Sequence, residues 1–258
     1  MLLFSYLKST ILSKVVMAVT GVLLVLFLLG HGIGNMQVFL GKEVYNNYAH
    51  FLQSLGELLW VIRAVLLLSL IFHIITSVRL KFYNNSAKPV KYRIKRYMKA
   101  KLTSRTMIWT GIMVFAFLVY HLLHLTLGVT NPDHFDYNEY YAVKAYSIAD
   151  DATRNQVIES GQISIQAQPV VYERHDVYKM VILGFRDPWI SLAYIIGVIL
   201  LGFHLNHAIQ SMFQTLGLNH TTYNGFFRKL GPVLSTILVL CYISIPITIF
   251  LGLVGAGV

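Results

Sequence analysis

Five long apolar stretches constrain the fold of this chain more than any other feature of its sequence. A helix that crosses the ~30 Å hydrocarbon core of a bilayer needs about 20 apolar residues, because it rises ~1.5 Å per residue. Five stretches meet this length, and they run approximately from Lys14 to Gln37, Gly56 to Leu80, Arg105 to Val129, Pro188 to Phe213 and Leu230 to Leu253. We therefore predict an all-α integral membrane protein, with residues 1–258 forming a single domain of five transmembrane helices.

The composition agrees with this prediction. Of the 258 residues, 56% are apolar and 12% are charged, a balance that a water-soluble domain could hardly cover with polar surface. The 21 Lys and Arg outnumber the 11 Asp and Glu, but beside membrane helices a basic excess reports topology, and no nucleic-acid partner is expected. The lone Cys241 excludes an intrachain disulfide and a Cys-x-x-Cys-His haem attachment, so any haem is held noncovalently.

Charges in the loops predict the orientation of the helices. The segment from Lys81 to Arg105 carries nine Lys and Arg and no acid, so the positive-inside rule places it, and with it the N-terminus, in the cytoplasm. The segment from Thr130 to Asp187 holds nine acids against five bases and is predicted to be a long extracytoplasmic loop. Ile163 and Ile165 alternate with polar residues, which suggests a β-hairpin that turns at Glu159 to Gln162.

Four of the ten histidines fall within four different predicted helices: His31, His73, His121 and His204. A polar ring in hydrocarbon is costly, so each histidine indicates a functional site, although any one alone could simply hydrogen-bond a neighbouring helix. Their depths can be counted because successive helices alternate in direction. His31 and His121 lie 17 and 16 residues beyond the cytoplasmic helix starts and form an outer pair. His73 and His204 lie 17 and 16 residues beyond the outer helix starts and form an inner pair.

Two pairs of imidazoles at two depths are what two stacked haems need, because each iron takes one axial nitrogen from either face. His124 and His207 lie three residues after His121 and His204, and the helical register leaves them open as alternative ligands. A haem-free transporter with histidines along its path is an alternative from another class. A cytochrome of the quinol-oxidising bc complex fits less well, because it would carry two histidine pairs, each pair on two helices, whereas here four helices contribute one favoured ligand each.

Several motifs carry a resemblance to a known family. They are Gly21 with Gly30 and His31 ten residues on, the Ala-His-Phe at residues 49–51, His73 followed by Arg79, Gly111 with His121 ten residues on, and the stretch from Phe203 to Gly217. In these motifs the chain resembles the di-haem cytochrome b anchor of succinate dehydrogenases and fumarate reductases with one five-helix subunit. The resemblance covers the helical frame and assigns the haem-iron ligands to His31, His73, His121 and His204. One departure is Gly202, where some fumarate-reducing members have a glutamate in a proton path.

The resemblance implies a function and a set of partners. Electrons would pass between a flavoprotein subunit, an iron–sulfur subunit, two b haems and a membrane quinone, expected to be menaquinone, during succinate oxidation or fumarate reduction. This chain would perform the quinone half within the lipid of a bacterial cytoplasmic membrane, with no complete activity alone, and the complex could form a homo-oligomer. The leading rival is a di-haem b subunit of a hydrogenase or formate dehydrogenase, against which the stretch from Phe203 to Gly217 argues.

The quinone site is expected on the outer side, close to the outer pair, because the resemblance suggests it. His50, Gln53, Glu57 and Arg63 are the candidate quinone-site residues in the first outer loop and the start of the second helix. A carboxyl group at Glu57 could take a proton from water and pass it to a reduced quinone oxygen. The alternative is that Glu57 only stabilises the first turn of its helix, where acids are favoured, and that Glu43 corresponds to the quinone-binding acid of the family.

Overall fold

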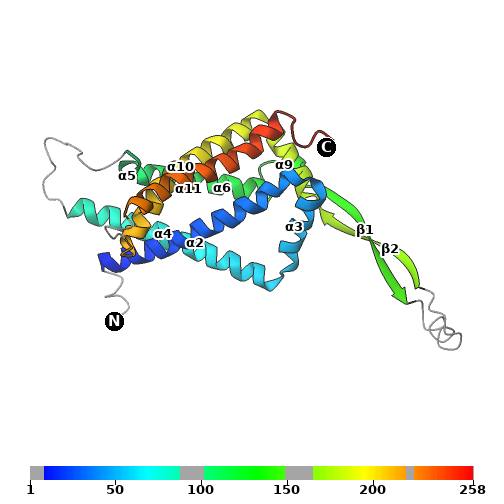
Figure 1. Ribbon diagram of the computed structural model, residues 1–258, viewed down its shortest axis with the longest axis horizontal. Coiled ribbons are helices and arrows are strands. Elements are labelled where there is room, and N and C mark those ends of the chain that lie inside the picture. Colours follow the sequence, from blue (N-terminus) through cyan, green and yellow to red (C-terminus); the bar gives the residue numbers. More distant parts are fainter. Residues whose placement is uncertain (1–8, 88–101, 149–164, 219–223, 258) are drawn as a thin grey trace.

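The computed structural model describes residues 9–87, 102–148, 165–218 and 224–257. Its long helices are α2 (Thr10–Met36), continued by the 3-10 turn η1 (Gln37–Leu40), α4 (Glu57–Ser86), α6 (Met107–Leu125), α10 (Pro188–Thr215) and α11 (Asn224–Phe250). These five helices are long and apolar enough to cross a membrane, and they form one elongated bundle (Figure 1). The prediction of five membrane-spanning helices is therefore confirmed.

The helix ends differ from the predicted ends by a few residues, mainly where polar residues continue a helix beyond its apolar part. The helix α4 runs to Ser86 rather than to Leu80, so the first residues of the predicted basic loop are helical. The short helix α5 (Leu102–Arg105) precedes α6. Most of the basic segment, residues 88–101, lies outside the described residues.

The predicted outer loop from Thr130 to Asp187 contains regular structure. It holds α7 (Pro132–Phe135), the strands β1 (Asn138–Ile148) and β2 (Ile165–His175), and α9 (Val177–Arg186). The strands pair antiparallel, with Asn138 opposite His175, and they project away from the bundle (Figure 1). We call the end of the bundle from which these strands project the hairpin end. The predicted turn at Glu159 to Gln162 lies outside the described residues.

The prediction that the whole segment from Thr130 to Asp187 is a loop is wrong at α9. Its sequence, Val177 to Arg186, is amphipathic but only ten residues long, too short to stand out beside the acidic residues before it. Asp176 begins the helix by accepting a hydrogen bond from the backbone N–H of Lys179 at 3.0 Å. Asp187 caps α10 in the same way through the N–H groups of Trp189 and Ile190.

A second amphipathic helix, α3 (Lys42–Ser54), connects α2 to α4 at the hairpin end (Figure 1). Gly41 and Gly56 precede α3 and α4 with φ angles of 97° and 54°, a conformation that other residues rarely adopt. These two glycines allow the chain to turn sharply at either end of α3. Tyr45 and Asn46 on one face of α3 are buried in the protein, while Phe51 is exposed.

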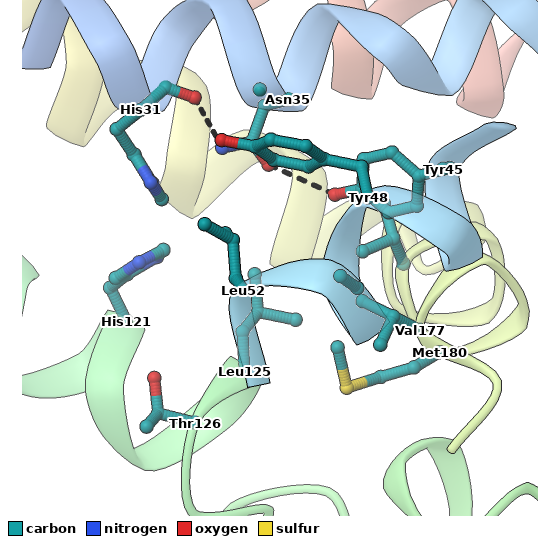
Figure 2. A pocket seen from close by; sticks show the side chains of 13 residues that line it. His31, Asn35, Tyr45, Tyr48, Leu52, His121, Leu125, Thr126, Val177 and Met180 are labelled. Atoms are coloured by element: carbon teal, nitrogen blue, oxygen red, sulfur yellow. Dashed lines mark hydrogen bonds between the residues drawn. The ribbon is translucent and has the colours of Figure 1, made fainter. Parts of the chain in front are cut away.

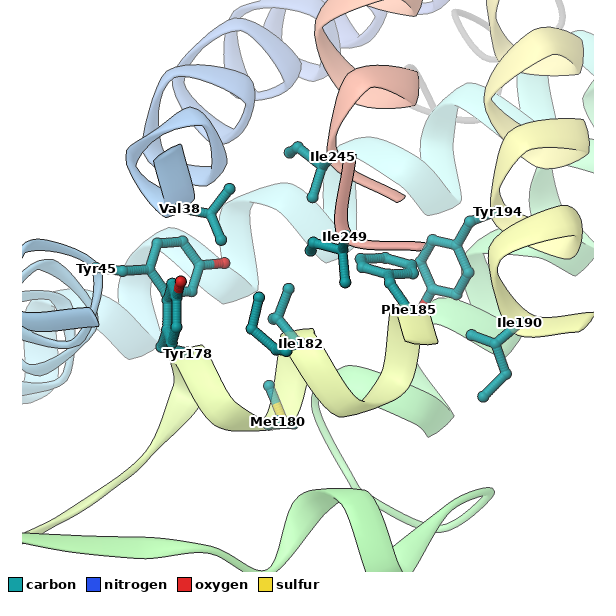
Figure 3. Close-up of a cluster of buried hydrophobic side chains, with 11 residues drawn as sticks. Val38, Tyr45, Tyr178, Met180, Ile182, Phe185, Ile190, Tyr194, Ile245 and Ile249 are labelled. Carbon is teal, nitrogen blue, oxygen red and sulfur yellow. The ribbon is translucent and has the colours of Figure 1, made fainter. Parts of the chain in front are cut away.

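The largest buried cluster of apolar side chains also lies at the hairpin end. There α9 packs against η1, α3 and the ends of α10 and α11 (Figure 3). Ile182 of α9 and Ile249 of α11 are fully buried in this cluster. Phe117 and Tyr120 of α6 pack against the same cluster, so this core holds α6 in place next to the outer histidine pair.

Candidate functional site

The four predicted histidines lie together in two pairs inside the bundle. The ring centres of His31 on α2 and His121 on α6 are 5.9 Å apart, and those of His73 on α4 and His204 on α10 are 6.5 Å apart. These are the same outer and inner pairs that depth counting along the sequence predicts. In each pair the two rings are steeply inclined to each other, at 88° and 65°.

The spacing within each pair fits a haem iron. A ring nitrogen binds a transition metal at about 2 Å and lies about 1 Å from its ring centre, so two axial ligands have ring centres about 6 Å apart. Both observed distances agree with this value. Among the described residues no group of three or more His, Cys, Asp or Glu could hold a bare metal ion. Haem needs only two protein ligands, because the porphyrin supplies the other four nitrogens, so the donor set suits haem better than a bare ion.

Each ring of the inner pair contacts the membrane-spanning helix that precedes its own helix in the chain. Nδ1 of His73 lies 3.2 Å from the carbonyl oxygen of Met17 and 3.4 Å from Oγ1 of Thr20, both on α2. Nδ1 of His204 lies 3.4 Å from Oγ1 of Thr110 on α6. A carbonyl oxygen can only accept, so the proton of His73 must be on Nδ1, which leaves the lone pair on Nε2 for a metal.

The outer pair borders a cavity of about 200 Å³ at the hairpin end (Figure 2). His31 and His121 both line it, and α3 and α9 close its other sides with Tyr48, Leu52 and Met180. The wall also includes Asn35, whose amide is satisfied because it donates to His31 O at 2.8 Å and accepts from the Tyr45 hydroxyl at 3.0 Å.

The two alternative histidines do not complete either pair. His124 is 2% exposed, and its Nδ1 lies 2.9 Å from the Tyr194 hydroxyl, so its ring is already engaged in a contact between α6 and α10. Its Nε2 has no hydrogen-bond partner within the described part of the chain, and the ring packs against the backbone of Gly184. On α10 it is the ring of His204, rather than that of His207, that stands 6.5 Å from His73.

The four candidate quinone residues are not gathered around the cavity. Glu57 is the first residue of α4 and is exposed, and Arg63 lies with its guanidinium 5.0 Å over the Trp60 ring. His50 and Gln53 lie on the exposed face of α3. None of the four lines the cavity, because the face of α3 turned towards it carries other residues: Tyr45, Tyr48, Ala49 and Leu52.

A network of charged groups joins the hairpin to α3 beside this cavity. Arg174 of β2 is buried and bonds Glu139 of β1 at 2.6 Å, while Lys42 of α3 bonds both Glu139 and Asp176 at 2.8 Å. Asn46, also buried, donates to the same two carboxylates. Burial opposes ionisation of Glu139 and Asp176, but these hydrogen bonds outweigh it and lower the pKa of both carboxyls. Hydrogen bonds from Lys42 to the two acids raise the pKa of its ammonium.

Sequence reasoning missed several residues of the site. Thr20 and Thr110 touch the inner pair, and Tyr194 packs against His121 with ring centres 5.8 Å apart. A signal for the threonines is present in the sequence, since each precedes a glycine that was itself noticed for its spacing to a histidine. Nothing comparable marks Tyr194.

Comparison of the chain with protein-family models, curated proteins and solved structures finds no match. The class that the fold defines is a multi-pass α-helical membrane protein.

Proposed function

We propose that this chain is the membrane anchor and di-haem cytochrome b subunit of a succinate:quinone oxidoreductase. It would pass electrons between an iron–sulfur subunit and a membrane quinone, in succinate oxidation or in fumarate reduction. The observation that carries the proposal is the pairing of four histidines from four helices at ring distances suited to an iron. The resemblance of the motifs around these histidines supports this particular complex.

The helices hold the two pairs at a separation that suits electron transfer. The ring of His73 rests against Gly21 of α2, and His31 lies ten residues further along the same helix, which corresponds to ~15 Å. When bound, two haems would supply one-electron chemistry at two depths in the membrane. The protein contributes the spacing, the orientation of each ring and the exclusion of water.

The proposed quinone site is at the hairpin end, beside the outer pair. There the cavity wall offers polar groups of Tyr48 and Thr126 close to His31 and His121 (Figure 2). Glu57 is the proposed proton donor to the reduced quinone, because it is exposed at the end of α4 that adjoins α3.

An absorption spectrum and the composition of the purified complex test this function. The chain should be isolated with two noncovalent haems, visible as Soret and α bands, together with a flavoprotein and an iron–sulfur subunit identified by mass. A chain that is purified from its own membrane without haem would overturn the proposal in favour of the transporter. Two haems together with hydrogenase or formate dehydrogenase subunits would retain the cytochrome and replace the complex.

A further inference from the structure

The helices α2 and α6 carry the same residues at the same spacing. Their sequences match at six positions that are each 90 residues apart: Met17 and Met107, Thr20 and Thr110, Gly21 and Gly111, Phe27 and Phe117, Leu28 and Leu118, and His31 and His121. The helices that follow in the bundle, α4 and α10, share the dipeptide Phe-His, at residues 72–73 and 203–204. Two helix pairs, α2 with α4 and α6 with α10, thus carry matching residues around the four histidines.

The repeated Thr-Gly motif has the same contact in both copies. In the first, the ring of His73 lies 3.5 Å from where a Cβ on Gly21 would stand, with Nδ1 at 3.4 Å from Thr20 Oγ1. In the second, the ring of His204 lies 3.4 Å from a Cβ on Gly111, with Nδ1 at 3.4 Å from Thr110 Oγ1. In the first copy the backbone three residues before the threonine also accepts from the ring, because Nδ1 of His73 lies 3.2 Å from Met17 O.

The geometry of the threonines makes them acceptors for the imidazole N–H. Thr20 donates its own hydroxyl proton to the Val16 carbonyl at 2.7 Å, and Thr110 donates to the Met107 carbonyl at 3.0 Å. The oxygen lone pairs are therefore the part of each hydroxyl that faces Nδ1. An acceptor on this side of a metal-bound imidazole fixes its tautomer and makes the ring a stronger electron donor to the metal.

The outer pair has different surroundings. Within the described residues, no hydrogen bond to the protein reaches a ring nitrogen of His31 or His121. Aromatic rings pack around them instead, with Phe27 stacked on His31 at 5.2 Å and Tyr194 edge-on to His121 at 5.8 Å. The Thr-Gly motif therefore acts on the inner pair alone, although both copies of the repeat also carry an outer histidine.

We propose that Thr20 and Thr110 are symmetry-related positioning residues that set the ring orientation and the reduction potential of the inner haem from its two opposite faces. This inference rests on the proposed function, because it needs the inner pair to bind haem. A threonine oxygen that accepts a hydrogen bond from the imidazole N–H makes the ring a stronger electron donor to iron. Both threonines therefore stabilise the oxidised metal. Removing either hydroxyl makes the inner haem easier to reduce.

The test is a redox titration of the full chain in its complex, followed by the α band. Thr20→Val and Thr110→Val remove the hydroxyl with little change in shape, Thr20→Ser and Thr110→Ser restore it, and Thr248→Val is the control. Thr248 is suited to this role because, in the part of the chain that the structure describes, its hydroxyl bonds only carbonyls of its own helix, α11, at Ser244 and Ile245. The haem that disappears in His204→Ala identifies the inner one.

Two haems per chain should persist in the valine variants, and the midpoint potential of the same, inner haem should rise in both. The expected change is a severalfold shift of its reduction equilibrium, where tenfold corresponds to 59 mV for one electron. The serine variants should return to the wild-type potential and Thr248→Val should not depart from it. If a valine variant instead loses one haem, rescue by serine supports the proposal and failure of rescue overturns it.

If the valine variants bind two haems and their midpoint potentials are unchanged, this inference is overturned and the proposed function stands. The same conclusion follows if Thr20→Val and Thr110→Val shift the potentials of two different haems. A wild-type chain without haem would overturn both.

Discussion

Replacing His204 with alanine should halve the haem content of the complex, from two per chain to one. The size of the effect follows from the geometry, because the ring centre of His204 stands 6.5 Å from that of His73 and each iron needs both of its axial nitrogens. The haem between His31 and His121 should be retained, because its ligands come from α2 and α6. The assay is the ratio of extracted haem to protein, together with the amplitude of the α band.

Double substitutions test the pairing more strictly than single ones. Since His73 and His204 serve one iron, the variant that lacks both should contain the same single haem as either variant alone. A variant that lacks His204 and His121 should contain none. If both double variants lost the same amount of haem, the pairing would be refuted.

The neighbouring histidines provide matched controls for these variants. His207→Ala removes an imidazole one helical turn from His204, and His124→Ala removes one that lies against Tyr194 rather than His31. Both variants should keep two haems. Full haem content in His204→Ala with loss in His207→Ala would move the ligand by one turn and refute the assignment made from ring distances.

Three further predictions concern the hairpin end. Asn46→Ala should weaken the attachment of the hairpin by about 3 kcal/mol, because it removes two hydrogen bonds to carboxylates and one from a buried N–H, and amide exchange at the start of α9 should then rise by about a hundredfold; less than a tenfold rise would contradict this. Glu139 and Asp176 have lowered pKa values, so their stabilisation is complete above their ordinary values of 4.5 and 3.8, and it is lost as the pH falls from these values through the lowered pKa values of the folded protein. Proteolysis of the hairpin should therefore accelerate below about pH 4.5, and a rate independent of pH, measured with an acid-active protease, would argue against the network. Glu57→Gln should leave both haem spectra intact and lower quinone-linked turnover while dye reduction by the flavoprotein persists; unchanged quinone turnover would remove this residue from the mechanism.

The sequence alone was sufficient for the five spans, because the hydropathy of a 20-residue stretch is local information and a bilayer accepts little else. It was also sufficient to predict which histidines lie level with each other, since a helix converts residue number into distance at a constant rate. The antiparallel direction of successive spans then made His31 level with His121, and the structure places those two rings 5.9 Å apart.

Other features were decided by contacts between residues far apart in the chain. Val177–Arg186 became a buried helix because η1, α3 and α11 surround it, and no property of the segment alone shows those neighbours. The candidate residues Gln53 and Arg63 are exposed because the rotation of α3 and α4 turns other side chains inward, and helix rotation is set by packing against partners.

The same distinction separates His121 from His124. Both lie near the end of one helix, three residues apart, and an α-helix places such residues on nearly the same face. Only the position of α2 and α10 decides that the first ring meets His31 while the second meets the Tyr194 hydroxyl. Residue type, spacing and depth were thus determined by the sequence, and the partner of each ring was determined by the tertiary structure, because the direction of a side chain has meaning only relative to the helices around it.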